Sequence, residues 1–253
     1  MLTDSFSLVG KVALVTGCNT GLGQGMALGL AQAGCDIVGV NLSQPTETKE
    51  KVEAEGQQFI NISADLMLQE VIPDIVKQAA SAFGKIDILV NNAGIIRREN
   101  AIDFTEQNWD DVININLKTV FFLSQAIAKQ FISQGKGGKI INIASMLSFQ
   151  GGIRVPSYTA SKSAVMGITR AMANEWAKYN INVNAIAPGY MATNNTAALR
   201  SDDERSKEIL ARIPAQRWGT PADIAGPCVF LASAAADYIN GYTIAVDGGW
   251  LAR

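Results

Sequence analysis

Residues 11–23 read KVALVTGCNTGLG, an aliphatic run that leads directly into a glycine-rich turn. The run Lys11–Thr16 predicts a buried strand, and the residues that follow the turn carry apolar side chains at helical spacing. Glycines at such a junction permit a tight turn and let backbone N–H groups approach a pyrophosphate at the positive end of a helix. The stretch therefore predicts a strand–turn–helix unit that holds a dinucleotide.

The same alternation of strand and helix continues along the whole chain. Six further buried strands are expected at Asp36–Asn41, Gln58–Ser63, Ile86–Asn91, Lys139–Ala144, Asn182–Ala187 and Thr243–Val246. Their nearly continuous Val, Ile and Leu content is typical of a parallel sheet covered on both faces, and amphipathic stretches between them predict crossover helices. We therefore expect an α/β protein with a single-domain Rossmann-type doubly wound fold, a seven-stranded parallel sheet flanked by helices.

One domain is expected over residues 1–253, because the sequence shows no linker, repeat or low-complexity segment. Residues 190–214 have no obvious place in the sheet. They are expected to form either a helical substrate lid or a surface decoration.

Composition excludes several classes of function. The 253 residues are 48% hydrophobic and only 17% charged, with a net charge of −2 and no basic cluster, so no nucleic acid partner is expected. The sequence has no stretch of about 18 apolar residues and no secretory signal, so we expect a cytoplasmic protein without a membrane partner.

The absence of histidine restricts the chemistry further. It removes Ser-His-Asp and Cys-His catalysis, and three scattered cysteines (Cys18, Cys35 and Cys228) suit neither a disulfide framework nor a zinc site. No metal is therefore expected. Proton transfer near neutral pH must come from tyrosine, lysine or a carboxylate.

Five ordered motifs resemble the short-chain dehydrogenase/reductase family. They are the spacing G-x-x-x-G-x-G at Gly17, Gly21 and Gly23 after Thr16, the NNAG motif at 91–94, Asn116, Ser145 with Tyr158-x-x-x-Lys162, and Pro188-Gly189 with Thr193. The resemblance covers nearly the whole chain and implies a nicotinamide-dependent oxidoreductase. It also implies a catalytic set of four residues, Asn116, Ser145, Tyr158 and Lys162.

Tyr158 and Lys162 lie four residues apart on an expected helix, so their side chains share a face. A phenol titrates near pH 10, and we expect the nearby ammonium to lower that pKa and make Tyr158 the general acid and base. Ser145 can hydrogen-bond to the substrate oxygen. By resemblance, Lys162 also holds the nicotinamide ribose, and Asn116 supports a water-linked proton path.

The resemblance implies a dinucleotide site along the carboxyl edge of the sheet. Its expected residues are Gly17, Asn19, Thr20, Gly21, Leu22, Gly23, Asn41, Asp65, Leu66, Asn92, Ala93, Gly94, Tyr158, Lys162, Pro188, Gly189, Met191 and Thr193. Asn41 stands where NAD enzymes often have an acidic residue, but no nearby cation is present to bind a 2′-phosphate. We therefore expect NAD as cofactor, with some leakage to NADP.

Three longer stretches, 18–39, 145–163 and 187–196, resemble members of the family that act on a small keto sugar acid. A carboxylate substrate favours an arginine anchor, and Arg154, Arg97 and Arg98 lie near the catalytic residues in sequence, with Ser145 and Tyr158 as the other expected substrate contacts. Each arginine has an alternative role as a surface charge or a salt bridge. The alternative functions are reduction of 5-ketogluconate or of a 3-oxoacyl thioester, or a non-catalytic NAD-binding regulatory protein.

The family resemblance also implies a homotetramer. The long segments Trp109–Ile132 and Ser157–Lys178 are expected as interface helices, and the apolar C-terminal stretch 248–252 as a second contact. Two independent two-fold interfaces generate such an assembly. The alternative is that these helices only cover their own sheet.

Overall fold

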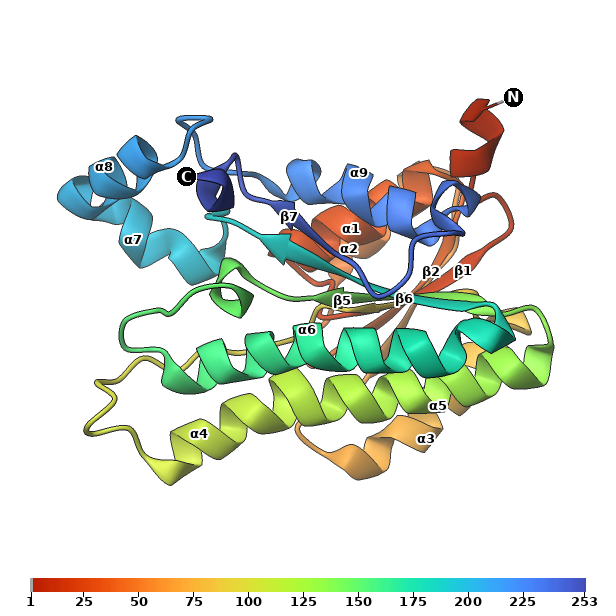
Figure 1. Cartoon of the computed structure of the whole chain (residues 1–253). Helices are drawn as coiled ribbons and strands as arrows, with labels where there is room; N and C mark the ends of the chain where they lie inside the picture. Colours follow the sequence, from red (N-terminus) through yellow and green to blue (C-terminus); the bar gives the residue numbers. More distant parts are fainter. Residues whose placement is uncertain (1) are drawn as a thin grey trace.

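A computed structural model describes residues 2–253, so Met1, the first residue of the expected domain 1–253, lies outside the described residues. Within this range seven strands form one parallel sheet in the order β3-β2-β1-β4-β5-β6-β7 (Figure 1). The strands are β1 (Val12–Thr16), β2 (Asp36–Asn41), β3 (Phe59–Ser63), β4 (Ile88–Asn91), β5 (Gly138–Ile143), β6 (Ile181–Pro188) and β7 (Thr243–Val246). The predicted fold is therefore confirmed, and each predicted strand end lies within two residues of the observed one.

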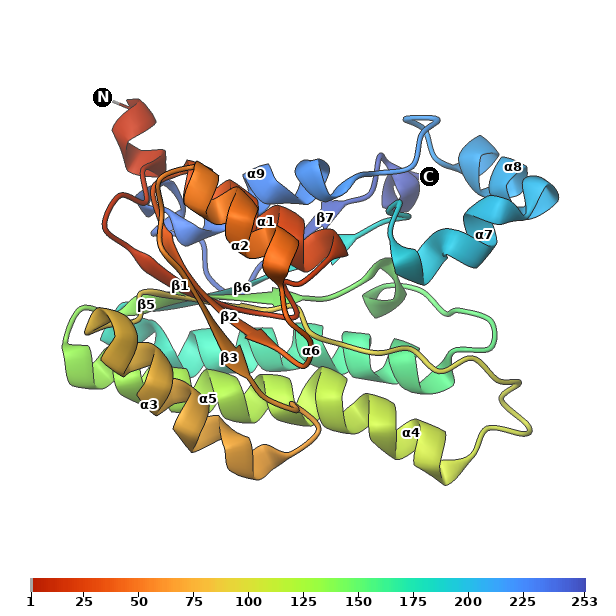
Figure 2. The ribbon, with the colours of Figure 1, turned by 180° about the vertical axis from the view of Figure 1, so that it is seen from behind.

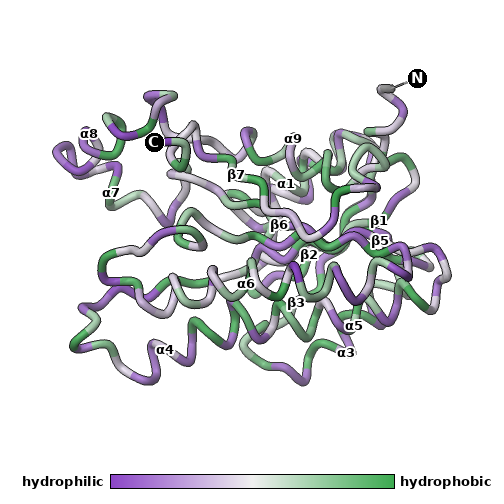
Figure 3. Tube along the Cα trace, viewed as in Figure 1, coloured by the Kyte–Doolittle hydropathy of each residue, from purple (hydrophilic) through white to green (hydrophobic). Residues whose placement is uncertain are grey.

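Helices cover both faces of the sheet (Figures 1 and 2). One face carries α1 (Gly21–Gln32), α2 (Thr46–Ala54) and α9 (Pro221–Ala232), and the other carries α3 (Ile72–Phe83), α4 (Glu106–Ile113), α5 (Thr119–Gln134) and α6 (Pro156–Trp176). Successive residues of β1 point to opposite layers, so Ala13 and Val15 join one hydrophobic cluster while Val12 and Leu14 join the other. This two-sided burial explains why most residues of the strands are apolar (Figure 3).

The expectation of one uninterrupted helix over Trp109–Ile132 is wrong, because the α-helix changes to a π turn within this segment. The residues from Asn114 to Lys118 form a π-helical turn between α4 and α5, in which the N–H of Thr119 bonds to the carbonyl of Asn114. Single π turns inside α-helices often occur at functional sites. This turn carries Asn116.

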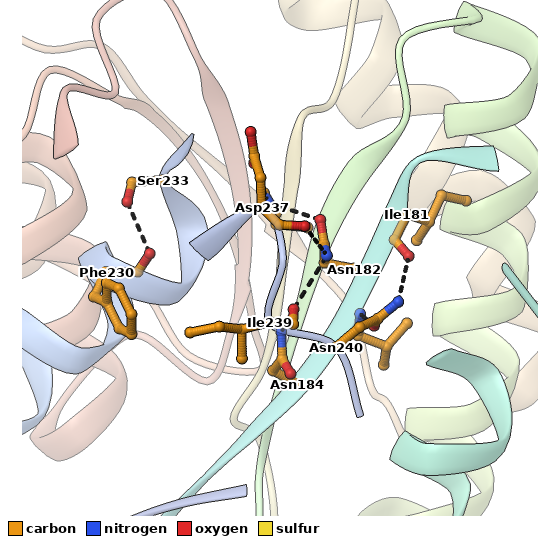
Figure 4. Close-up of polar contacts among 10 residues, drawn as sticks. Ile181, Asn182, Asn184, Phe230, Ser233, Asp237, Ile239 and Asn240 are labelled. Carbon is orange, nitrogen blue, oxygen red and sulfur yellow. Dashed lines mark hydrogen bonds and ion pairs between the residues drawn. The ribbon is translucent and has the colours of Figure 1, made fainter. Parts of the chain in front are cut away.

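The amino end of β6 is held to the segment before β7 by two asparagines, the half-buried Asn182 and the buried Asn184 (Figure 4). The Asn182 amide donates to the carbonyls of Asp237 and Ile239 at 3.0 and 3.1 Å, and the Asn184 amide donates to Ile239 at 2.8 Å. A cavity of about 720 Å³ lies beside this network. These hydrogen bonds hold β7 at the edge of the sheet. The carboxyl end of β7 therefore lies on the same side of the sheet as the carboxyl ends of the other strands.

Residues 190–214 are largely helical, with a 3₁₀ turn at Asn194–Thr196 followed by α7 (Ala197–Ser201) and α8 (Asp203–Arg212). Figure 1 shows α7 and α8 beyond the carboxyl edge of the sheet, next to the C-terminus. There the guanidinium of Arg212 stacks 3.9 Å from the ring centroid of Trp250. No described helix combines the length and apolarity needed to cross a membrane.

Candidate active site

The glycine-rich loop after β1 takes the shape that was expected from its sequence. Gly17 and Gly21 have φ angles of 63° and 59°, a conformation that favours glycine. A Cβ at Gly23 would collide with the carbonyl of Gly17, so the first turn of α1 packs directly on the loop. Thr20 precedes α1, and its side chain caps none of the N–H groups in the described first turn. Those donors face the position that suits a phosphate.

The end of β4 is tied to the end of β1 through Thr16 and Asn92. The Thr16 hydroxyl accepts from the N–H groups of Asn92 and Ala93 at 3.0 and 2.9 Å. In return, the Asn92 amide donates to the carbonyls of Thr16 and Gly17 at 3.0 and 2.9 Å. Strands β1 and β4 flank the point where the strand order reverses, which is where doubly wound sheets form their ligand crevice.

A cleft of about 490 Å³ opens at this reversal point. Most of the predicted cofactor residues line it, namely Gly17, Asn19, Thr20, Gly21, Leu22, Gly23, Asn41, Asp65, Leu66, Asn92, Ala93, Gly94, Tyr158, Lys162 and Thr193. Sequence reasoning missed other wall residues, including Met67, Ile95, Ile115 and Asn195. Most of these residues are next to a motif residue in the chain, and this position is the one sequence feature that could have identified them as part of the cleft wall.

Three predicted cofactor residues, Pro188, Gly189 and Met191, are not among the residues that line this cleft. Pro188 ends β6, and a Cβ at Gly189 would lie 2.6 Å from Asp247 Cα. Met191 is buried beside Gly219. These residues instead connect β6 to the helical segment that carries Thr193.

At one end of the cleft, Asn41 has a buried acceptor without a partner. Its amide nitrogen donates to Asn61 Oδ1 at 2.8 Å and to Cys18 Sγ at 3.4 Å. Its Oδ1 atom is buried and has no hydrogen-bond partner among the described residues. A buried acceptor of this kind is costly unless a donor reaches it. A ligand hydroxyl would supply that donor.

The catalytic residues predicted from the sequence come together at the other end. Tyr158 and Lys162 lie on α6, and Ser145 lies two residues beyond β5, where its hydroxyl is hydrogen-bonded to the Tyr158 side chain. The Lys162 ammonium lies 5.7 Å from the centroid of the Tyr158 ring and donates to the carbonyl of Ile143 at 2.6 Å. Two hydroxyls and a cation therefore lie close together, and Tyr158 and Lys162 line the cleft.

Asn116 supports this arrangement from the π turn and is fully buried. Its amide nitrogen donates to the carbonyl of Ile95 at 2.9 Å, and its Oδ1 accepts from the N–H of Ile95 at 2.9 Å. It also donates to the hydroxyl of Ser161 at 3.3 Å, and that hydroxyl donates to the carbonyl of Tyr158 at 2.8 Å. Asn116 therefore links the loop after β4 to the catalytic helix.

The electrostatics of Tyr158 differ from what the sequence predicted. Burial raises the pKa of Tyr158, and it outweighs the hydrogen bond from Ser145 and the charge of Arg98, which both lower it. The expectation that the ammonium of Lys162 lowers the pKa of Tyr158 below its ordinary value is therefore wrong. Burial also lowers the pKa of Lys162 to about 8, because the ammonium loses hydration in the interior.

The three arginines considered as carboxylate anchors have different surroundings. Arg98 is exposed, donates to the carbonyl of Asn195 at 3.2 Å, and acts on Tyr158 through its charge. Arg97 pairs with the carboxylate of Asp111 at 3.1 Å. Arg154 is exposed, with a φ of 65°, and its carbonyl accepts from the N–H of Glu99. Of the three, Arg97 lines the cleft, and Arg98 is the one whose charge lowers the pKa of Tyr158.

These features fit a dinucleotide. The glycine-rich loop leaves space that a Cβ would fill, and the first turn of α1 offers N–H donors. The unpartnered Oδ1 of Asn41 can accept a hydrogen bond from a hydroxyl. Tyr158 and Lys162 line the same cleft, and Ser145 adjoins them through its hydrogen bond to Tyr158.

Comparison with known proteins defines the class. Residues 17–251 match the family model described as enoyl-(acyl carrier protein) reductase. The chain belongs to the short-chain dehydrogenase/reductase family, and it is a dehydrogenase of the group that acts on a CH–OH bond.

Several of its relatives are named as dehydrogenases of sugar acids. The 2-dehydro-3-deoxy-D-gluconate 5-dehydrogenase of Escherichia coli strain K12 is 72% identical over 253 residues, which is 100% of both chains. A solved structure from Agrobacterium tumefaciens with bound NADP is 53% identical, with a TM-score of 0.93, and covers 99% of this chain and 100% of that one. A gluconate 5-dehydrogenase from Burkholderia cenocepacia, in complex with NADP and tartrate, is 37% identical with a TM-score of 0.94 and covers 100% of both chains.

Proposed function

We propose that this chain is an NAD(H)-dependent dehydrogenase that interconverts 2-dehydro-3-deoxy-D-gluconate and 3-deoxy-D-glycero-2,5-hexodiulosonate. The observation that carries the proposal is the Ser145–Tyr158–Lys162 cluster at one end of a dinucleotide cleft. The full-length 72% identity to the Escherichia coli enzyme supports this substrate. We place the reaction in the breakdown of uronates such as those released from pectin.

Tyr158 is the group that moves the proton. When a nicotinamide cofactor is bound, it supplies or accepts the hydride. During reduction the Tyr158 hydroxyl donates a proton to the substrate oxygen, and during oxidation the phenolate takes it back. Because burial raises the pKa of Tyr158, the phenol stays protonated at neutral pH and is ready to act as the acid. Ser145 bonds to the same oxygen and orients it.

Lys162 and Asn116 position the catalytic helix. The Lys162 ammonium is fixed by the carbonyl of Ile143 and lies near the Tyr158 ring, where it can hold a ribose hydroxyl of the cofactor. Its pKa of about 8 lets it exchange a proton close to neutrality. Asn116 supports the water-linked proton path by fixing the Ile95 loop against α6.

We assign the substrate carboxylate to Arg98 rather than to Arg154. Arg98 reaches the carbonyl of Asn195, so it bridges the loop after β4 and the helical segment 190–214 next to Tyr158. Arg97 is partly neutralised by Asp111. A guanidinium suits a carboxylate because its planar fork can donate two parallel hydrogen bonds. Residues 190–214 would then act as a lid that carries one wall of the substrate site.

The preference for NAD(H) rests on Asn41. Its unpartnered Oδ1 can accept from a ribose 2′-hydroxyl, whereas a 2′-phosphate offers acceptor oxygens that would repel it. The cations among the described residues that line the cleft, Arg97 and Lys162, belong to other segments. The NADP found in related structures belongs to those proteins and is compatible with leakage to NADP(H) here.

We also propose a homotetramer. On α4 and α5, the large apolar side chains of Trp109, Phe122 and Ile132 are between 41% and 44% exposed. Two copies packed through this face would bury them. The C-terminal contact is the second proposed interface.

The test is the oxidation reaction. Purified protein is mixed with 2-dehydro-3-deoxy-D-gluconate and NAD⁺, and formation of NADH and of the diketone is followed by absorbance and mass spectrometry. We expect stoichiometric formation of both products. Binding of NAD⁺ without turnover of any sugar acid would favour the regulatory alternative.

A further inference from the structure

The π turn gives three neighbouring side chains different tasks. In a π turn the backbone bond joins residues five positions apart, so Asn114 and Thr119 lie above one another on the same side. In a regular α-helix, residues five apart point in clearly different directions. Asn116, between them, faces Ile95 and the catalytic helix instead.

Asn114 and Thr119 both hold the loop that follows β3. The Thr119 hydroxyl, which is buried, donates to the carbonyl of Leu66 at 2.7 Å, and the Asn114 amide donates to the carbonyl of Met67 at 2.7 Å. Leu66 and Met67 line the cleft with Asp65. The side chain of Asp65 accepts from the N–H of Met67 at 3.0 Å and completes the turn.

Gln69 closes the network into a ring. Its amide nitrogen donates to the hydroxyl of Thr119 at 2.8 Å and to Asn114 Oδ1 at 3.2 Å. Asn114 and Thr119 therefore each accept a hydrogen bond from the amide nitrogen of Gln69 and donate one to a backbone carbonyl of the 65–67 loop. In each of the four bonds a donor faces an acceptor. The side-chain amide of Asn114 and the hydroxyl of Thr119 therefore each have one orientation that satisfies both of their bonds.

We propose that Gln69, Asn114 and Thr119 are positioning residues that couple the adenine end of the cofactor cleft to the turn that carries Asn116. This inference rests on the proposed function and on the family resemblance, which implies that Asp65 and Leu66 hold the adenine of the cofactor; Met67 lines the same cleft. A ligand that orders the 65–67 loop orders Asn114 and Thr119 with it. The same turn then holds Asn116 against Ile95, next to the catalytic helix.

The test uses AMP, a probe that carries the adenine end of the cofactor and lacks the nicotinamide. Hydrogen–deuterium exchange of the whole protein is measured with and without saturating AMP. We expect slower exchange at the amides of 65–69, and also at Ile95 and 114–119. Protection confined to the 65–69 segment would overturn the coupling, even if NADH binds and turnover is normal.

Thr119→Val tests the network directly, because it removes the hydroxyl and keeps the shape of the side chain. We expect the Kd for AMP and for NADH to rise about five- to tenfold, as for loss of a buried hydrogen bond. We also expect the AMP-dependent protection of Ile95 to disappear. Gln69→Leu, which leaves the Thr119–Leu66 bond in place, should give a smaller effect in the same direction.

Thr169→Val is the matched control. Thr169 is also fully buried, and its hydroxyl also donates to a carbonyl (Val165, 2.7 Å) and accepts from an amide (Asn142, 2.9 Å), but it lies away from the 65–67 loop. We expect a similar loss of thermal stability with unchanged AMP affinity and protection. Equal effects of the two valine variants on AMP affinity would overturn the proposal. If NADH does not bind the wild-type protein at all, the proposed function itself is wrong.

Discussion

The ammonium of Lys162 donates a 2.6 Å hydrogen bond to the backbone carbonyl of Ile143, the last residue of β5. This contact holds the charge inside the protein, where burial lowers the pKa of Lys162 to about 8 from an ordinary value of 10.5. Lys162, which lies next to Tyr158, can therefore gain or lose its proton near pH 8.

The pH dependence of reduction should reflect this lysine. Because the pKa of Lys162 is lowered, its positive charge is complete well below pH 8 and is lost as the pH rises through about 8. We expect kcat/KM for the ketone to be level below that pH and to fall above it. In Lys162→Arg the charge persists at higher pH, so the residual activity should lose this alkaline decline. An unchanged decline in the arginine variant would assign it to another group.

Tyr158→Phe should remove most of the turnover and leave cofactor binding nearly intact. The ring remains, but the proton-transferring hydroxyl that pairs with Ser145 is lost. A loss of about 10²- to 10⁴-fold in kcat is expected for a positioned acid and base. The measurement pairs single-turnover rates with NADH titration by fluorescence. A variant within about threefold of wild type at every pH would show that another group moves the proton.

The sheet could be predicted from the sequence because each central strand is buried on both faces. The run from Val12 to Thr16 is apolar without interruption, and its glycine-rich continuation has one common structural use. The placement of Tyr158 and Lys162 on one helix could also be predicted, because their spacing of four residues puts both side chains on the same face. Their catalytic role stays a prediction. Predictions of this kind succeed where the local sequence determines the position of the side chains.

Long loops limited the rest of the prediction. Arg98 and Arg154 are both exposed, but only Arg98 donates to the carbonyl of Asn195 and lowers the pKa of Tyr158 through its charge, although Arg154 is closer to Tyr158 in sequence. The π turn also has no clear sequence signal, because its apolar pattern continues that of a long helix. As a result, the roles of Asn114 and Gln69 could be recognised only in three dimensions.

Arg98→Met should weaken catalysis with the sugar acid more than with a neutral analogue that lacks the carboxylate. We expect kcat/KM for the acid to fall by about 10- to 150-fold, which corresponds to loss of one charged hydrogen bond. Arg154→Met is the matched control and should change either substrate by less than about threefold. Equal losses on both substrates in Arg98→Met would make the role of Arg98 structural.

Cofactor choice should depend on Asn41. We expect the wild-type protein to use NADH with a higher kcat/KM than NADPH, because the Asn41 acceptor suits a 2′-hydroxyl. Asn41→Asp adds a negative charge and should raise the Kd for NADPH at least about tenfold while changing that for NADH little. Isothermal titration of both cofactors measures this difference. Equal kcat/KM for the two cofactors in the wild-type protein would refute the NAD(H) assignment.

The most direct test of the central claim is a comparison of ketones in the reduction direction. NADH oxidation is measured with 3-deoxy-D-glycero-2,5-hexodiulosonate, with 5-ketogluconate and with an acetoacetyl thioester, each over a range of concentrations. We predict the highest kcat/KM for the 3-deoxy diketone, lower turnover of 5-ketogluconate, and little turnover of the thioester. Turnover of the thioester alone would contradict the account.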